Sequence, residues 1–319
     1  MPQSEFSLIE RYFANTGTTQ YSAKLSQGDD AAIVEIPPGK QAVMSVDTLV
    51  SGIHFPEQTS AADIAHKALA VNLSDLAAMA ATPAWFLLSI TLPEVDETWL
   101  AEFSARLKNI ADQYEIELIG GDTCRGHLSI TVQVTGLVDK DRYVTRSGAN
   151  IGDLILVSGQ LGNAARGLAF LQKKIRLPKE EQELAVQALN RPIPRLCLTA
   201  FLQKYASAAI DISDGLIGDL KHILEKSGVG AVIRQADLPV NKWIKQNNAF
   251  QYALSGGDDY ELCLTVSPDH RNHINAWNQN NPDCQLHEVG EVTESGYYLI
   301  TDDQNVDLTR AKGYQHFGE

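Results

Sequence analysis

The chain has 319 residues, 44% of them hydrophobic, and this length predicts two domains rather than a single core. Acidic residues outnumber basic ones by 40 to 26, and the formal net charge of −14 argues against a broad nucleic-acid interface. The sequence contains no apolar run long enough to span a membrane and does not begin like a signal peptide. The four cysteines form no CxxC pair, so we expect reduced thiols and a cytoplasmic protein.

The first part of the chain predicts helices and strands that pack as an α/β (α+β) domain. Helices are expected over 4–13, 60–81 and 96–114, the second of them opened by a capping box of Ser60 and Asp63. Strands are expected over 31–36, 85–93 and 128–138. A further strand should end at Asp47, and another should end before a Gly-Gly-Asp turn at 120–122.

A polar, glycine-containing stretch over 139–152 predicts a boundary, which divides the chain into domains 1–139 and 140–319. The second domain should contain a strand over 153–159, a glycine turn into a helix, and a helical region over 179–205 broken by the sequence RPIPR. Two later segments each read as an acidic turn beside a strand, at 208–214 and 255–266. The region 288–309 is expected to form a hairpin that precedes a short tail.

Aspartates recur beside glycine or serine, mostly where strands are expected to end. They are Asp29, Asp30, Asp47, Asp75, Asp122, Asp211, Asp214, Asp258 and Asp259. Hard oxygen ligands in several separate turns suit Mg²⁺ ions that also bind a polyphosphate. An aspartate in such a turn also often does no more than accept backbone N–H groups. Asp75 favours the metal interpretation over a structural ion pair, because it lies within an Ala- and Leu-rich helix where an uncompensated carboxylate is costly.

The common nucleotide-binding and hydrolase motifs are missing from the sequence. It has no GxxxxGK[ST], no GxGxxG between a strand and a helix, no HExxH and no GxSxG. The eight histidines show no zinc-ligand spacing. A nucleotide would therefore be bound through metal-holding aspartates rather than through a P-loop.

Several motifs, in order along essentially the whole chain, carry a family resemblance. They include GDD, SVDTLV, NLSDLAAM, GGDT, RSGA, RPIPR, DISDGL and SGGDDYEL. Together they resemble the thiamine-monophosphate kinase family, within the superfamily of aminoimidazole ribonucleotide synthetase. The resemblance implies two domains, the first adding strands to a barrel shared by a homodimer. It also implies ATP-dependent, Mg²⁺-assisted phosphorylation of thiamine monophosphate to thiamine diphosphate, the last step of thiamine diphosphate biosynthesis.

The resemblance also implies roles for individual residues. The metal-binding positions are Asp30, Ser45, Val46 through its backbone carbonyl, Asp47, Asp75, Asp122, Asp211 and Asp214. The nucleotide-binding positions are Gly121, Asp122, Arg146 and Ser213, and the thiamine phosphate positions are His54, Asp258 and Tyr314. Asp47, Asp122 and Asp211 are the expected catalytic aspartates, whereas Asp29 and Asp259 are expected to be local turn residues.

Two positions depart from the family pattern. Cys124 stands where threonine is frequent, and Asp258 stands where glutamate is usual, which could shift the substrate contact. One alternative is a sister enzyme that uses ATP on another small substrate, although the glycine-rich N-terminal cysteine of a selenophosphate synthetase is missing. Another alternative is a non-catalytic protein that binds metal as a scaffold. Individually, His54 could cap a loop, Arg146 could be a surface residue, and Tyr314 could pin the C-terminal tail.

Overall fold

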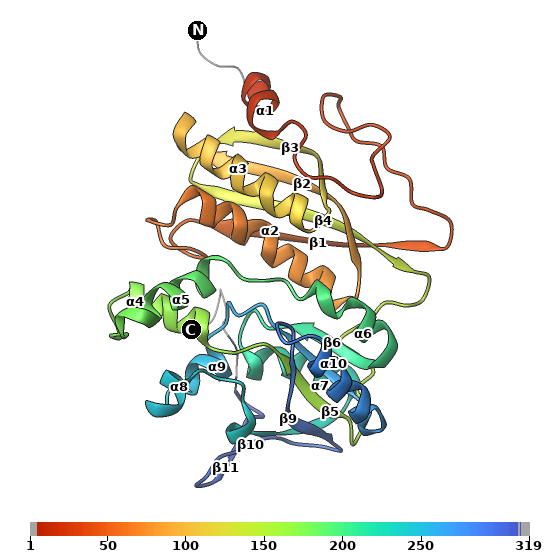
Figure 1. Cartoon of the computed structure of the whole chain (residues 1–319), viewed down its shortest axis with the longest axis vertical. Coiled ribbons are helices and arrows are strands. Elements are labelled where there is room, and N and C mark those ends of the chain that lie inside the picture. The colour runs from red at the N-terminus through yellow and green to blue at the C-terminus, as the bar shows by residue number, and fades with distance from the viewer. Residues whose placement is uncertain (1–4, 312, 314–319) are drawn as a thin grey trace. The chain divides into compact units, whose positions relative to one another are not determined.

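The computed structural model describes residues 5–311 and 313, and these divide into two compact units (Figure 1). The first unit comprises the residues up to Leu76 together with Ala81–Arg142. The second comprises Ala77–Ala80 and the residues from Tyr143 onward. Both units combine helices with a β-sheet, as the sequence predicted. Among the described residues, no helix has the length and hydropathy to cross a membrane.

The first unit is built on a four-stranded sheet with the order β1-β4-β2-β3 in the described residues. Its strands are β1 (Lys40–Val50), β2 (Thr82–Leu92), β3 (Glu117–Arg125) and β4 (Ser129–Asp139), and its helices are α1 (Glu5–Phe13), α2 (Ala61–Ala78) and α3 (Glu97–Gln113). Strands β2 and β3 are parallel, whereas β4 pairs antiparallel with both β1 and β2.

Local capping explains where the two longer helices of this unit begin. The hydroxyl of Ser60 accepts a hydrogen bond from the Asp63 N–H at 3.1 Å, as expected at the start of α2. The carboxylate of Asp96 accepts hydrogen bonds from the N–H groups of Thr98 and Trp99 and so opens α3. Apolar side chains of α3, including Phe103, are fully buried and anchor the helix in the core.

Three expectations for the first unit were wrong. Strand β1 runs beyond Asp47 to Val50, and the 31–36 segment forms only an isolated bridge from Ile33 to Leu25. The Gly-Gly-Asp sequence lies inside β3 instead of forming a turn. Its glycines serve close strand packing, because a Cβ atom on Gly121 would lie 1.8 Å from the carbonyl oxygen of Leu88 on β2.

The second unit contains a seven-stranded sheet with the order β11-β10-β7-β9-β5-β8-β6 among the described residues. The strands are β5 (Leu154–Ser158), β6 (Ala206–Asp211), β7 (Gly230–Arg234), β8 (Leu262–Val266), β9 (Leu286–Thr293), β10 (Tyr297–Ile300) and β11 (Asn305–Asp307). The helices are α4 (Asn163–Leu171), α5 (Lys179–Asn190), α6 (Thr199–Tyr205), α7 (Leu216–Ser227), α8 (Lys242–Gln246), α9 (Gln251–Ser255) and α10 (Arg271–Asn280), with short 3₁₀ turns η1 (Leu196–Leu198), η2 (Gln235–Asp237) and η3 (Pro268–His270).

The hairpin expected within 288–309 is present, between β10 and β11. Strand β9 pairs with β5 and β7, whereas β10 pairs parallel with β7 and forms its hairpin with β11. Helix α10 was not anticipated, because its sequence is strongly polar and Ile274 is the residue of the helix that is buried. The pairing of β9 and β10 with the distant strands β5 and β7 could not be expected from the order of strands in the sequence.

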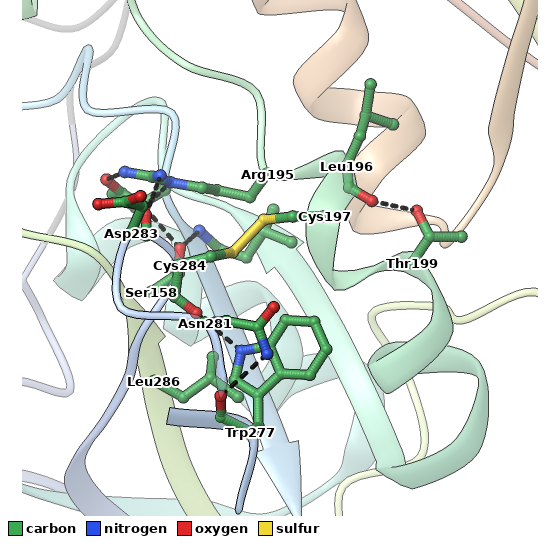
Figure 2. Close-up of a disulfide and its surroundings, with 12 residues drawn as sticks. Ser158, Arg195, Leu196, Cys197, Thr199, Trp277, Asn281, Asp283, Cys284 and Leu286 are labelled. Atoms are coloured by element: carbon green, nitrogen blue, oxygen red, sulfur yellow. Dashed lines mark hydrogen bonds and ion pairs between the residues drawn. A yellow bond between two sulfur atoms is a disulfide. The ribbon is translucent and has the colours of Figure 1, made fainter. Parts of the chain in front are cut away.

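The cysteines also correct an expectation. Cys197 and Cys284 form a disulfide that links segments 87 residues apart in the sequence, so these two are not reduced thiols (Figure 2). Cys124 is free and exposed, and Cys263 is free and buried. Burial raises the pKa of the Cys263 thiol, which makes it unreactive at neutral pH. Sequence spacing could not reveal this pair, because its two segments meet only in the folded second unit.

Candidate functional site

One cluster of predicted metal ligands forms in the first unit, between β1 and α2. The Ser45 hydroxyl donates a hydrogen bond to Oδ2 of Asp75 at 2.6 Å. The Asn72 side-chain oxygen accepts the N–H of Asp47 at 3.1 Å, which ties the middle of β1 to α2. Ser45, Asp47 and Asp75, here called the β1–α2 cluster, thus share one side of the sheet because alternate residues of a strand point the same way.

Electrostatics in the β1–α2 cluster favour a cation. Burial of its carboxyl group, and then the negative charge of Asp75, raise the pKa of Asp47 to about 6, although the residue as a whole remains exposed. Two carboxylates and a hydroxyl are hard oxygen donors, which fit Mg²⁺. No group of three or more His, Cys, Asp or Glu residues able to hold a metal occurs within residues 5–311 and 313. Such a pair of carboxylates suits a Mg²⁺ ion that takes its other ligands from water and phosphate.

Asp122 is not brought together with the β1–α2 cluster. It pairs in register with Ser89, which pairs with Thr131, and the hydroxyl of Thr131 lies 2.8 Å from that of Thr48. Asp122 therefore faces the same side as Thr48, opposite to the side of Asp47. Strands β1 and β3 are also the two edges of the sheet, about 14 Å apart at the usual spacing of strands.

The other predicted residues of the first unit have local contacts. The Asp29 carboxylate accepts the N–H of Asp30 at 2.9 Å, so Asp29 is a turn residue as expected, and Asp30 is exposed. Nδ1 of His54 accepts the N–H of Val50 at 3.0 Å, which caps a turn and leaves the ring proton on Nε2. The Val46 side chain is 58% exposed on the face away from Asp47, so a metal contact there would use its carbonyl. The roles of Asp30, His54 and Val46 stay predictions.

In the second unit, two acidic loops lie side by side. The first, called the 211–214 loop, carries Asp211, Ser213 and Asp214, and the second, called the 256–261 loop, carries Asp258. The N–H of Asp258 donates a hydrogen bond to the Ser213 carbonyl at 2.8 Å, and the N–H of Tyr260 donates one to the Ile212 carbonyl at 2.8 Å. These bonds place the predicted metal and nucleotide residues of one loop next to the predicted substrate residue of the other.

Asp219, on the first turn of α7, holds the 211–214 loop and was assigned no role from the sequence. Its carboxylate accepts the N–H of Asp214 at 3.0 Å and also that of Ser213. Burial raises its pKa to about 7, a change that Arg146 partly opposes through its positive charge. Arg146 is exposed and acts on this loop electrostatically, as a phosphate-binding residue could. The signal was present directly after the DISDGL motif, where the sequence continues IGDL and Asp219 is its aspartate.

Asp258 and Asp259 have different environments although they are adjacent. Asp258 has a φ of 63°, an uncommon conformation for a residue with a side chain. The Asp259 carboxylate accepts the N–H of Gly162 at 2.8 Å and that of Ala164, which caps the start of α4. Burial holds the pKa of Asp259 well above its usual range. Asp259 therefore caps a helix 97 residues away in the sequence instead of being the local turn residue that was expected. Tyr314 lies outside the described residues.

Comparison with known proteins gives matches along both units. Residues 28–138 match the family of the AIR synthase related protein, N-terminal domain, and residues 150–302 match the corresponding C-terminal domain. Thiamine-monophosphate kinase of Escherichia coli (strain K12) is 43% identical over 99% of this chain and 99% of its own. The Haemophilus influenzae protein of the same name is 42% identical over 100% and 99% of the two chains.

Solved structures give the same result. A crystal structure of thiamine-monophosphate kinase from Stenotrophomonas maltophilia K279a has a TM-score of 0.82 at 41% identity, covering 87% of this chain and 90% of that one. AaThiL complexed with AMPPCP and TMP has a TM-score of 0.77 at 32% identity, covering 91% of each chain. Escherichia coli HypE, at 20% identity and a TM-score of 0.77, shares the fold.

Proposed function

The chain belongs to the thiamine-monophosphate kinase family, and we propose that it transfers the γ-phosphoryl group of ATP to thiamine monophosphate, forming thiamine diphosphate. The whole-length identity to kinases of this name carries the proposal, because it spans both acidic regions. The two-domain fold expected from the motifs is confirmed. A sister enzyme acting on another substrate is less well supported, since HypE shares the fold at only 20% identity. Because ATP is available in the cytoplasm, we place the enzyme there, although the Cys197–Cys284 disulfide removes the argument from reduced thiols.

The chemistry requires two anions to approach each other. The acceptor is a phosphate monoester that is largely ionised at neutral pH, so a general base has little to do. Mg²⁺, when bound, would neutralise the phosphate oxygens and align them. Within the first unit, Asp47 and Asp75 are the residues that would hold Mg²⁺. Within the second, Asp211 and Asp214 would do so, and Arg146 offers a planar fork of phosphate donors. In the second unit, Asp258 would contact the thiamine phosphate, and the contact implied for His54 stays a prediction.

The assay is direct. Purified protein is incubated with Mg²⁺, ATP and thiamine monophosphate, and thiamine diphosphate and ADP are separated by chromatography. We expect both products in equal amounts, and Asp47→Asn should remove most of the activity while the circular dichroism spectrum stays unchanged. ADP without thiamine diphosphate would point to a sister enzyme, and the lack of any ADP would favour the metal-binding scaffold.

We further propose a homodimer in which the first unit supplies the nucleotide-binding surface. The face of its sheet that carries Asp122 also exposes apolar side chains, with Met44 at 67% and Leu87 at 39% exposure. A second copy packed on this face would cover them. It would also bring Asp122, exposed on the edge strand β3 of this face, to the subunit interface, where it could complete a site together with acidic residues of the other copy.

Mixing two inactive variants tests this arrangement. Asp47→Asn and Asp122→Asn are each prepared, mixed in equal amounts under conditions that exchange subunits, and assayed. If each site combines Asp47 of one subunit with Asp122 of the other, half of the dimers are mixed and each has one intact site. Activity should then recover to about one quarter of the wild-type value. No recovery despite proven exchange would refute the shared site, and a monomer by sedimentation would refute the dimer.

A further inference from the structure

A buried charged network stands behind the 256–261 loop. Glu261 is 5% exposed, and its carboxylate accepts hydrogen bonds from Arg195, with Nε at 2.6 Å from Oε2 and Nη2 bonded to Oε1. The Ser158 hydroxyl, fully buried at the end of β5, donates to Oε2 at 2.6 Å. Arg195 also donates from Nη1 to the Asp283 carbonyl at 3.3 Å, beside the disulfide (Figure 2). The guanidinium thus uses its planar fork on one carboxylate and one backbone group.

The residues of this network also have backbone contacts that reach the 211–214 loop and the start of β8. The Glu261 carbonyl accepts the N–H of Ile212 at 2.7 Å, and the Ser158 hydroxyl accepts the N–H of Leu262 at 2.8 Å. The side chain of Glu261 is therefore held by Arg195 and Ser158, and its backbone carbonyl is bonded to the 211–214 loop. Asp258, three residues earlier, is bonded to the same loop through Ser213.

This loop needs external support to keep its conformation. Asp258 and Tyr260 have φ values of 63° and 51°, which cost free energy and persist only where the surroundings impose them. The space around Glu261 is also filled, because a Cβ atom on Gly159 would lie 2.1 Å from Oε1. Glu261 consequently has little room for a different side-chain position.

The network is a poor device for stability alone. Burying a carboxylate and a guanidinium costs desolvation free energy, and replacing a buried ion pair by apolar side chains is often neutral or stabilising. A pair that anchors the end of the 256–261 loop, and is buried at this cost, indicates a role in holding the conformation of that loop.

We propose that Arg195 and Glu261 are positioning residues that align Asp258 for binding of thiamine phosphate. The inference rests on the proposed kinase function. The inference predicts different effects on the two substrates. The 211–214 loop, which carries the predicted nucleotide-binding Ser213, is held independently because its N–H groups donate to the carboxylate of Asp219. Loss of the Arg195–Glu261 pair should therefore loosen the acceptor contact more than the nucleotide contact.

The test replaces the pair by apolar residues, Arg195→Met with Glu261→Leu, so that no buried charge is left alone. The matched control is Arg166→Met with Glu181→Leu, which removes another ion pair of the second unit, one between α4 and α5. We expect the KM for thiamine monophosphate to rise at least about tenfold in the first double variant. The KM for ATP should change less than about twofold there, and both constants should stay near wild type in the control. Arg195→Lys, which keeps the charge but loses the fork, should give an intermediate KM.

The outcomes separate the two proposals. Wild-type activity with an unchanged KM for thiamine monophosphate in the double variant would overturn the positioning role and leave the kinase function standing. An equal rise of both KM values would also overturn it, because a general loss of structure predicts that result. If the wild type forms no thiamine diphosphate, the kinase function fails. Amide hydrogen exchange over 256–261 then decides whether the pair holds the loop, with faster exchange expected in the first double variant than in the control.

Discussion

Removal of the Cys197–Cys284 disulfide should destabilise the second unit by a large and calculable amount. The bond closes a chain segment of 87 residues, and the loss of denatured-state entropy corresponds to about 4.6 kcal/mol at 25 °C. Measured values for native disulfides are commonly about 2–4 kcal/mol, so we expect a loss in this range. Cys197→Ser is the cleaner perturbation, because Cys197 is exposed whereas Cys284 is buried among apolar side chains.

Urea unfolding with and without dithiothreitol provides the assay. The free energy of unfolding of the second unit should fall by about 2–4 kcal/mol in Cys197→Ser. Dithiothreitol should cause a similar fall in the wild type and no further fall in the variant. Cys124→Ser, at the other exposed cysteine and in the first unit, is the control and should leave this transition unchanged. A loss below about 1 kcal/mol, or a wild type insensitive to the reductant, would refute the reasoning.

Three further predictions concern single residues. The pKa of Asp219 is about 7 in the folded protein against an ordinary value of 3.8, so the folded state binds this proton more tightly than the unfolded state. The resulting stabilisation of the folded state is complete below about pH 4 and is lost as the pH rises through 7. Urea unfolding in EDTA should show this fall, at up to about 1.4 kcal/mol per pH unit, and Asp219→Asn should show a smaller one. Because the pKa of Asp47 is about 6, the Mg²⁺ concentration for half-maximal activity should rise up to about tenfold per pH unit below 6, and a flat profile would contradict its metal role. Gly121→Ala should destabilise the first unit by more than about 2 kcal/mol in thermal unfolding, whereas Gly39→Ala, with no atom within 4 Å of its Cβ, should cost only about 1 kcal/mol of backbone strain.

Helices with local capping signals, such as α2 and α3, could be predicted, whereas the strongly polar α10 could not. A serine or aspartate before an apolar repeat caps the first turn within three residues, and the structure confirms this at Ser60 and Asp96. Strand pairing could not be predicted in the same way. The order of β7, β9 and β10 depends on contacts between distant segments, so only the local hairpin of β10 and β11 could be expected.

For the acidic residues, too, local motifs were informative and contacts between distant segments were not. Their identity and spacing were enough to point to metal-bound phosphate and, through the order of the motifs, to the kinase family. Motifs also led to the β1–α2 cluster and to the 211–214 loop. They did not reveal that Arg195 and Glu261 meet from segments 66 residues apart, nor that Asp219 holds the 211–214 loop.

The amino-acid sequence by itself determined the chemistry of this protein, because ligand type and helix capping depend on residues that are close along the chain. Only the tertiary structure decided which of those ligands can act together. Asp47 and Asp122 look equivalent in the sequence, yet sheet register places them on opposite faces and opposite edges of one sheet. Register is set by hydrogen bonds between strands that lie far apart in the sequence, and a shift of one residue would reverse the face of each side chain.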